Sequence, residues 1–271
     1  MNTLLFEIAL LLYFMSTIGH IASLVIRRVL VAKVSTWVLF SAFLVHSIYI
    51  ISRWAETGYG PVANSYESLS FVAWSISGIY LAFQIMTKTR VLGVFVSPLA
   101  FILAVGASVA LVGDIAMPES LKGSWVAIHI MLSLTGEALF ALAFLAGLMY
   151  LLQDNLIRKK KVYSFSRILP SLRDLDRINY ISIMWGFFLL TFGLIAGSIW
   201  ARTVWGSHWQ WDPKQISALV AWIIYALLVH QRIAIGWKGR KAAFLSIAAF
   251  IIILFTFVGV NIFFVTVHKF M

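Results

Sequence analysis

The chain has 271 residues, of which 62% are hydrophobic and 11% are charged, and its formal net charge is +11. This composition excludes an ordinary soluble globular domain and indicates an all-α, polytopic integral membrane protein. Cysteine is absent, which excludes a disulfide, a thiolate metal site and a thiol nucleophile in this chain.

Eight apolar stretches are each long enough to cross a bilayer as a helix, which takes about 20 residues. The apolar residues run continuously and do not alternate with polar ones, which argues against barrel strands. The first stretch lacks a basic leader and a small-residue cleavage site, so we expect it to remain as a span. No connection is long enough to fold by itself, so residues 1–271 are predicted to form one transmembrane domain. The predicted spans cover residues 3–26, 34–52, 68–87, 91–112, 124–153, 178–200, 216–236 and 242–262.

Basic residues are concentrated in alternate connections between the predicted spans. One set of connections carries sixteen Lys and Arg residues, whereas the other set carries five. The positive-inside rule therefore places both termini on the extracytoplasmic side, together with the connection at about 200–217. Topology is sufficient to explain this bias, and the basic residues lack interleaved aromatics, so no nucleic-acid partner is expected.

The connection at 200–217 is unusually aromatic. Its segment WGSHWQWDPKQ, residues 205–215, contains three of the eleven tryptophans of the chain. Tryptophan is generally enriched at membrane interfaces, but a simple belt would scatter these residues over many helix ends. The spacing of four and then two residues cannot place all three indoles on one helical face. We therefore predict a bent or partly unwound segment that serves as a platform for a flat ligand.

Three of the six histidines fall on the same predicted side as these tryptophans. His129 lies about five residues into the fifth predicted span, His268 follows the eighth, and His208 is inside the tryptophan loop. Imidazole ligands and aromatic walls are what haem iron and its ring require. We therefore expect His129 and His268 to belong to a haem site, and His208 to face water.

Other ionisable residues are predicted to lie deeper in the membrane. His230 is some fourteen residues into the seventh predicted span, roughly 21 Å deep, where such a group is costly and usually functional. Arg232 lies near the inner boundary and is expected to snorkel or to meet a haem propionate. His46 is nearer mid-membrane, and spacing leaves open whether it faces His230. Glu137 is either a proton relay or a polar helix contact, and the sequence does not choose between them.

Three segments together carry a resemblance to a known family. The segment SIWARTVWGSHWQWDPKQISALVAWIIYALLVHQR resembles the tryptophan-rich WWD segment of haem-handling proteins. Within that group the chain is similar to the CcsA/ResC subunit of the System II cytochrome c synthase. RWAETGYGPVANSYESLSFVAW resembles the first outer loop of that subunit, and GVNIFFVTVHKF resembles its terminal asparagine-to-histidine stretch.

The resemblance implies a function in cytochrome c biogenesis. The chain would bind haem b and present it at the outer face for thioether attachment to the CxxCH motif of apocytochrome c. His129 and His268 would be the axial ligands of the iron, and His230 would mark an intramembrane haem site. The WWD residues expected to contact haem are Trp205, Gly206, Trp209, Trp211, Asp212 and Pro213. Asp212 is expected to fix the loop by hydrogen bonding.

The resemblance also implies partners and a location. The chain would act as part of a cytochrome c synthase, or haem lyase, with a CcsB/ResB-type membrane subunit and, indirectly, a thioredoxin-like thiol reductant. No catalytic residue is implied beyond those that position haem. The expected location is the bacterial cytoplasmic membrane, with the active face outside.

The chain departs from the family pattern at several positions, and two alternative functions remain. His208 stands where relatives often have tyrosine, and Glu137 lies in a region expected to be uncharged. One alternative is a CcmC-type haem exporter or chaperone without synthase activity. The other is a quinone-linked, cytochrome b-like subunit, for which His46 and His230 would form a weak ligand pair.

Overall fold

The computed structural model describes residues 2–26, 28–62, 64–87, 89–109, 123–160 and 169–263. Over these ranges the regular secondary structure is entirely helical, which confirms the predicted fold class. One short 3-10 turn, η1 (Arg90–Leu92), precedes the fourth helix. The α-helices are α1 (Asn2–Ile26), α2 (Val29–Thr57), α3 (Ser65–Thr87), α4 (Gly93–Ser108), α5 (Ser124–Arg158), α6 (Leu172–Trp205), α7 (Pro213–Ile233) and α8 (Arg240–Phe263).

Each predicted span corresponds to one helix. Within the described ranges, seven of the helices are long and apolar enough to cross a membrane. Several helices extend beyond the predicted spans, and α6 is an example, because it begins at Leu172 and ends at Trp205. Its start is capped by Ser171, whose hydroxyl accepts from the Asp174 N–H, and its end by Gly206 in the left-handed region. Apolar runs mark the hydrocarbon depth, whereas capping residues set the helix ends.

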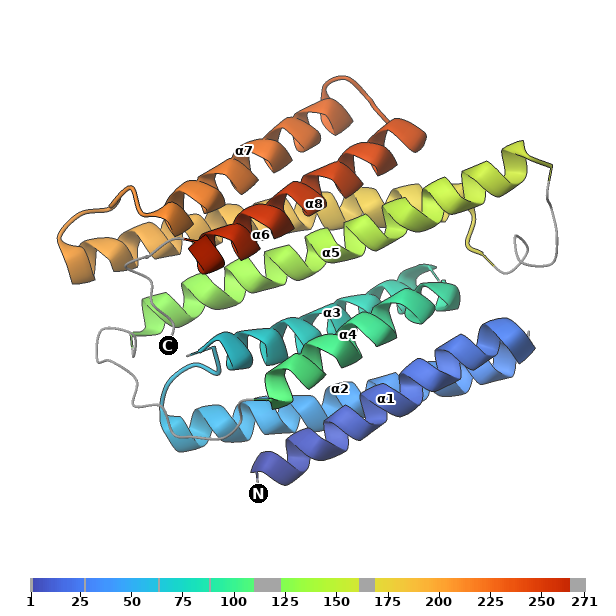
Figure 1. Cartoon of the computed structure of the whole chain (residues 1–271), viewed down its shortest axis with the longest axis horizontal. Helices are drawn as coiled ribbons and strands as arrows, with labels where there is room; N and C mark the ends of the chain where they lie inside the picture. Colours follow the sequence, from blue (N-terminus) through green and yellow to red (C-terminus); the bar gives the residue numbers. More distant parts are fainter. Residues whose placement is uncertain are drawn as a thin grey trace.

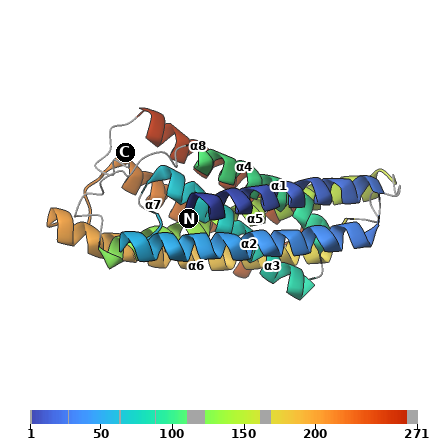
Figure 2. The same cartoon turned by 90° about the horizontal axis from the view of Figure 1, so that it is seen from below.

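The helices lie roughly along one axis in two groups, α1–α4 and α5–α8 (Figure 1). Helix α5 joins the groups, because it packs against α6 and α8 on one side and α3 on the other. The turned view shows the same elongated bundle (Figure 2). Close approach of α5 and α6 depends on glycine, since a Cβ on Gly136 would lie 3.0 Å from the Gly186 carbonyl oxygen. The two helices thus meet almost backbone to backbone.

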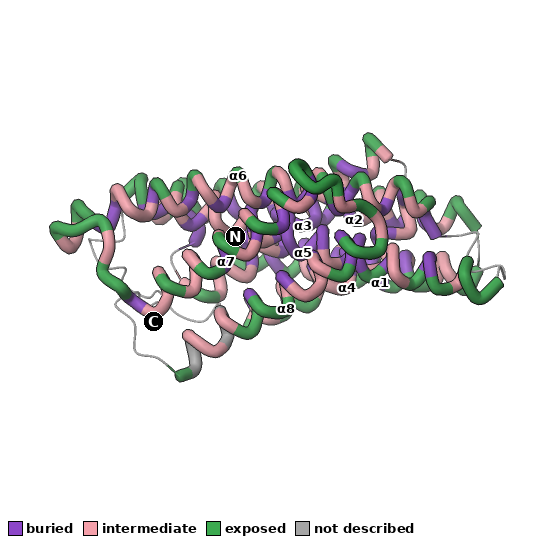
Figure 3. Tube along the Cα trace, turned by 90° about the horizontal axis from the view of Figure 1, so that it is seen from above, coloured by how far each residue is buried: buried purple, intermediate pink, exposed green. Residues whose placement is uncertain are grey.

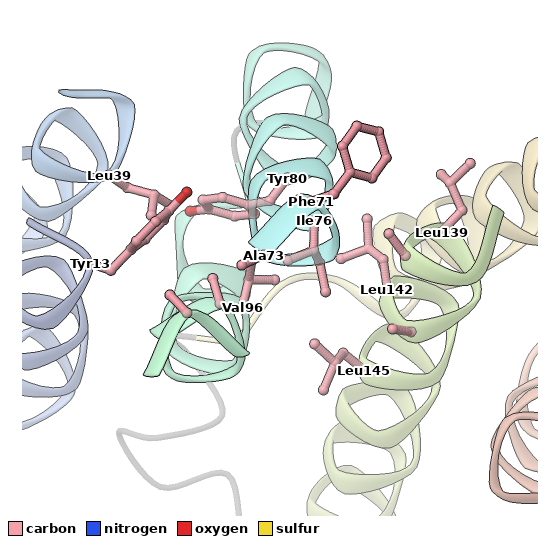
Figure 4. Packing of buried hydrophobic residues seen from close by; sticks show 14 of the residues in the cluster. Tyr13, Leu39, Phe71, Ala73, Ile76, Tyr80, Val96, Leu139, Leu142 and Leu145 are labelled. Atoms are coloured by element: carbon pink, nitrogen blue, oxygen red, sulfur yellow. The ribbon is translucent and has the colours of Figure 1, made fainter. Parts of the chain in front are cut away.

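Buried residues gather between the helices, and exposed residues lie on turns that face away from the bundle (Figure 3). The core between α1–α4 and α5 includes Tyr13, Leu39, Ile76, Tyr80 and Leu142, all fully buried (Figure 4). A bilayer would cover the many exposed apolar side chains on the outward faces.

The connections fall at two opposite ends of the bundle. The α2–α3 connection and the α6–α7 connection lie at the end where α1 begins and α8 finishes (Figure 1). We call this the tryptophan-loop end. The opposite end carries basic residues from three helices, including Arg158, Arg232 and Arg240. The charge segregation read from the sequence is therefore present, and the side of the membrane that each end faces stays a prediction.

Candidate functional site

The tryptophan loop is a fixed, irregular turn between two capped helices. Helix α6 ends at Trp205, and the next residue, Gly206, has a φ of 73°. Asp212 caps α7, since its carboxylate accepts from the Lys214 N–H at 2.9 Å. Pro213 then occupies the first turn of α7, where proline is well tolerated. The predicted bent segment is confirmed, and the loop-fixing hydrogen bond of Asp212 is present.

The tryptophans form two separate pairs. Trp205 packs edge to face against Trp200 of α6, with ring centroids 4.9 Å apart. Trp209 and Trp211 form a second edge-to-face pair at 5.8 Å, and Trp211 is 72% exposed. Trp205 therefore belongs to the packed end of α6. In the second pair, Trp209 is half-buried with its Nε1 enclosed, and Trp211 is the residue that projects toward the surroundings. Trp200 also belongs to the first aromatic pair. The tryptophan motif at residues 205–215 did not indicate it, because Trp200 lies more than one helical turn before that segment.

His129 is held in a defined orientation by α6. Its Nδ1 lies 2.7 Å from the Gly193 carbonyl oxygen, so Nδ1–H is the donor. The lone pair of this tautomer is consequently on Nε2. The ring packs over Gly197, where a Cβ would come within 2.6 Å of Nδ1. Gly197 thus makes room for the half-buried imidazole, while Gly193 supplies its carbonyl acceptor.

This arrangement is the one that metal-binding histidines use. A hydrogen bond from the second ring nitrogen to a carbonyl fixes the tautomer and the ring plane, and it raises the basicity of the coordinating nitrogen. In this tautomer, Nε2 is the nitrogen that could coordinate a metal. The sequence did not reveal this arrangement, because the Gly193 carbonyl acceptor and the space over Gly197 are apparent only when the facing helix is known.

The α2–α3 connection packs against the start of α5. A Cβ on Gly60 would lie 2.8 Å from the Ala127 Cβ, two residues before His129 in α5. Val62 and Val126 are both buried. We call the region around His129, made of the start of α5, the facing part of α6 and the α2–α3 connection, the outer site.

His208 is oriented by contacts with α6. Arg202 Nη1 donates to His208 Nε2 at 3.2 Å, and His208 Nδ1 donates to the Ser198 carbonyl oxygen at 3.2 Å. Both ring nitrogens are used along the last turns of α6, and the side chain is exposed. These contacts agree with the expectation that His208 faces water. His268 lies outside the described residues.

His230 lies on the outward face of α7. It continues an exposed apolar stripe and makes no side-chain hydrogen bond to any described residue. The structure does not bring it near His129, which packs between α5 and α6. The other members of the stripe are Ile216, Val220, Ile223 and Leu227.

His46 does not pair with His230. Its Nδ1 lies 3.1 Å from the Tyr13 hydroxyl and its Nε2 lies 2.8 Å from the Ser70 hydroxyl. Both nitrogens are therefore used inside the α1–α4 group, where the side chain is fully buried. The paired-ligand arrangement of a cytochrome b-like subunit is not present for these two residues.

The surroundings of the Arg232 side chain differ from those predicted from the sequence. The residue is 6% exposed, and its guanidinium pairs with Asp176 at 2.8 Å. It also donates to the Trp237 carbonyl oxygen and lies 5.1 Å from the centre of the Tyr180 ring. The expected snorkelling was wrong, and the alternative, contact with a haem propionate, stays a prediction. Arg232 instead ties α7 to the start of α6, because burying an arginine requires a paired carboxylate.

The fold and the outer site define a class of protein: a polytopic helical membrane protein with a capped tryptophan loop and an oriented histidine at one end. The sequence profile of the family described as "Cytochrome C assembly protein" matches residues 62–268, which is more than half of the chain. The chain belongs to this family.

Several relatives named "Cytochrome c biogenesis protein CcsA" are similar over most of their length. The protein from Guillardia theta is 33% identical over 236 residues, covering 79% of this chain and 78% of the relative. A protein from Prochlorococcus marinus is 30% identical over 280 residues, covering 93% and 86%. The protein from Microcystis aeruginosa is 32% identical over 259 residues, covering 78% and 79%.

One solved structure shares the fold. "Cytochrome c Heme Lyase CcmF" superimposes with a TM-score of 0.64 at 15% identity. The match covers 97% of this chain and 49% of that chain, so this chain spans about half the length of that protein. At this identity the likeness establishes the arrangement of helices alone.

Proposed function

We propose that this chain is the haem-presenting subunit of a System II cytochrome c synthase. Its family membership supports a role in cytochrome c biogenesis. Haem b, the substrate, is held at the outer site and offered to the CxxCH motif of apocytochrome c. In this proposal the tryptophan-loop end faces the extracytoplasmic side of a bacterial cytoplasmic membrane.

The observation that carries the proposal is the orientation of His129. Its Nδ1–H bonds to the Gly193 carbonyl oxygen, so Nε2 is the nitrogen that carries the lone pair in this tautomer. His268 is proposed as the opposite axial ligand. The nearby Trp209–Trp211 pair offers apolar, polarisable surface for a porphyrin ring, and the exposed Trp211 is the more accessible of the two.

The reaction needs positioning more than acid–base catalysis. Each cysteine thiol of the acceptor adds across one haem vinyl group, so a C–S bond forms and the vinyl double bond becomes single. The thiol proton ends on the neighbouring vinyl carbon, and no leaving group or oxidant is involved. A thioredoxin-like reductant contributes indirectly, by keeping the acceptor cysteines as thiols. The absence of cysteine from this chain prevents a competing thiol from reaching the vinyl groups.

The exposure of His230 supports the proposal that a second membrane subunit packs against α7. His230 lies in the last turn of α7, where its exposed imidazole continues an apolar face of a membrane helix, and such a group is costly unless something polar covers it. We assign that face of α7 to a CcsB/ResB-type partner, with His230 as an intramembrane waypoint for haem. In this proposal the partner subunit, and not the described part of this chain, supplies the groups that surround the imidazole.

The test is cytochrome c maturation in cells that lack any other maturation machinery. The chain, a CcsB/ResB-type partner and a cytochrome c are co-expressed, and covalently bound haem in the cytochrome is measured. We expect holocytochrome with the wild type and with the control His208→Ala, and none with His129→Ala. Bound haem without holocytochrome would favour the CcmC-type exporter instead. Full maturation by His129→Ala would refute the proposal.

A further inference from the structure

Glu137 is a carboxyl group within the membrane-spanning part of α5. It lies eight residues beyond His129, which is a little over two helical turns and about 12 Å along the axis. Ser133 lies midway, so the three side chains share one face of the helix. Among the described residues, the half-buried Glu137 side chain has no hydrogen-bond or ion-pair partner.

Two unpartnered hydroxyl groups lie beside it. The Ser133 Oγ and the Tyr225 hydroxyl are both buried and without a hydrogen-bond partner in the described part of the chain. Tyr225 of α7 is close enough to Glu137 to interact electrostatically, and its ring stacks on Phe140, one turn beyond Glu137. Glu137 is thirteen residues into α5 and Tyr225 twelve residues into α7, so both are roughly 18 to 20 Å deep.

Glu137, Ser133 and Tyr225 are polar groups inside the bundle, where burying a polar group without a hydrogen bond costs free energy. Unpartnered hydroxyls such as those of Ser75 and Ser182 also occur elsewhere in the described bundle. A carboxyl that has no cation beside it in hydrocarbon is most stable with a proton bound. A positive charge that appears nearby would stabilise the carboxylate and release that proton.

The other titratable groups around this depth are few. On α5 itself, His129 lies about two turns toward the tryptophan-loop end and Tyr150 lies toward the opposite end. On α7 the neighbour is Tyr225. The remaining titratable residues of the helices that pack on α5 lie toward helix ends: Tyr66, Glu67 and Tyr80 on α3, Arg173, Asp174, Asp176, Arg177, Tyr180 and Arg202 on α6, and Arg240 and Lys241 on α8. Helix α4 has none.

We propose that Glu137, assisted by Ser133 and Tyr225, is an intramembrane proton site coupled to the charge of the haem iron at His129. This inference rests on the proposed function. Ferric haem carries one more positive charge than ferrous haem, and water screens that charge poorly at this depth. When one electron is added to the iron, Glu137 takes up one proton. When the iron loses the electron, the proton is released.

The test is the midpoint potential of the bound haem as a function of pH, measured by mediated potentiometry. The sample is the purified complex of this chain with its CcsB/ResB-type partner. Because reduction takes up a proton, the wild-type potential should fall as pH rises. Glu137→Gln should lose the part of this pH dependence that comes from Glu137 and keep only the part that comes from the haem propionates, with the low-spin spectrum retained. Tyr225→Phe, which keeps the stacked ring, should give a smaller shift.

Thr135→Val is the matched control. Thr135 is on the same helix at similar depth, but its hydroxyl already bonds to the Met131 carbonyl oxygen. This variant should keep the wild-type pH dependence. A flat wild-type profile, or an unchanged slope in Glu137→Gln, would overturn the inference. The haem propionates titrate equally in both proteins, so the difference between them isolates Glu137.

A second measurement uses only the wild-type complex, so it does not depend on whether a variant folds. The reduction-induced infrared difference spectrum of the wild-type complex should gain the carbonyl band of a protonated carboxylic acid. Absence of that band would overturn the inference. A wild-type complex without bound haem would refute the proposed function as well, whereas bound haem with a flat pH profile would refute only the proton site.

Discussion

His46 in the α1–α4 group and His230 in the α5–α8 group have opposite surroundings. His46 is fully buried, and both of its ring nitrogens have side-chain partners. His230 faces outward and makes no side-chain hydrogen bond to any described residue. Both are histidines within apolar helices, so the helix alone does not distinguish an enclosed imidazole from an exposed one.

The largest predicted effect is the difference in stability between the variants His46→Leu and His230→Leu. The first change leaves the Tyr13 and Ser70 hydroxyls without their imidazole partner in a closed core, which should cost about 3 kcal/mol. The second removes an exposed side chain and should leave stability nearly unchanged. Thermal unfolding in detergent would measure both. Equal loss of stability in the two variants would break the comparison.

The next largest effect should come from Gly197→Ala. A methyl group there would meet the His129 ring, which must then move away from its carbonyl acceptor. Changes in the partners of metal-binding histidines typically weaken metal affinity by about 10- to 100-fold, and we expect haem affinity to fall by that amount. Gly259→Ala is the control, because a Cβ at Gly259 meets no atom within 4 Å. Haem titration of the purified complexes gives the affinities.

A smaller effect is expected from Asp212→Ala. The change removes the N-cap of α7, which is worth about 1 kcal/mol. The loop should loosen, so maturation should decline while the histidine ligation stays intact. Ser171→Ala, which removes the cap of α6 at the opposite end of the bundle, should lower stability similarly without this loss of maturation. Cytochrome c yield and thermal unfolding together test the difference.

The smallest effect is expected from His208→Ala. Its contacts with Arg202 and Ser198 lie in an exposed position, where hydrogen bonds contribute little. Haem spectrum and maturation should match the wild type. A lost spectrum would mean that His208, and not only His129, orients the haem.

Much of the fold follows from sequence because hydrophobic length is a local property. Eight apolar runs predicted eight helices, and the spacing of Trp205, Trp209 and Trp211 predicted a bent loop. The cap formed by Asp212 could also be predicted from the sequence, because an Asp-Pro pair before an apolar run is a local signal for the start of a helix.

The hydrogen-bond and ion-pair partners of the site residues could not be predicted from the sequence in the same way. The acceptor of His129 lies 64 residues away in sequence, and only the packing of α5 on α6 brings it near. Likewise, no local pattern distinguishes His46, enclosed by Tyr13 and Ser70, from the outward-facing His230. Arg232 was misread for the same reason, because Asp176 lies 56 residues before it.

The central claim is that the Nε2 atom of His129 coordinates haem iron at the tryptophan-loop end. The most direct measurement is the visible absorption spectrum of the haem-loaded complex, in the wild type and in His129→Ala. The account predicts a low-spin, bis-imidazole spectrum that the variant loses and that added imidazole restores. An unchanged low-spin spectrum in His129→Ala without imidazole would contradict it.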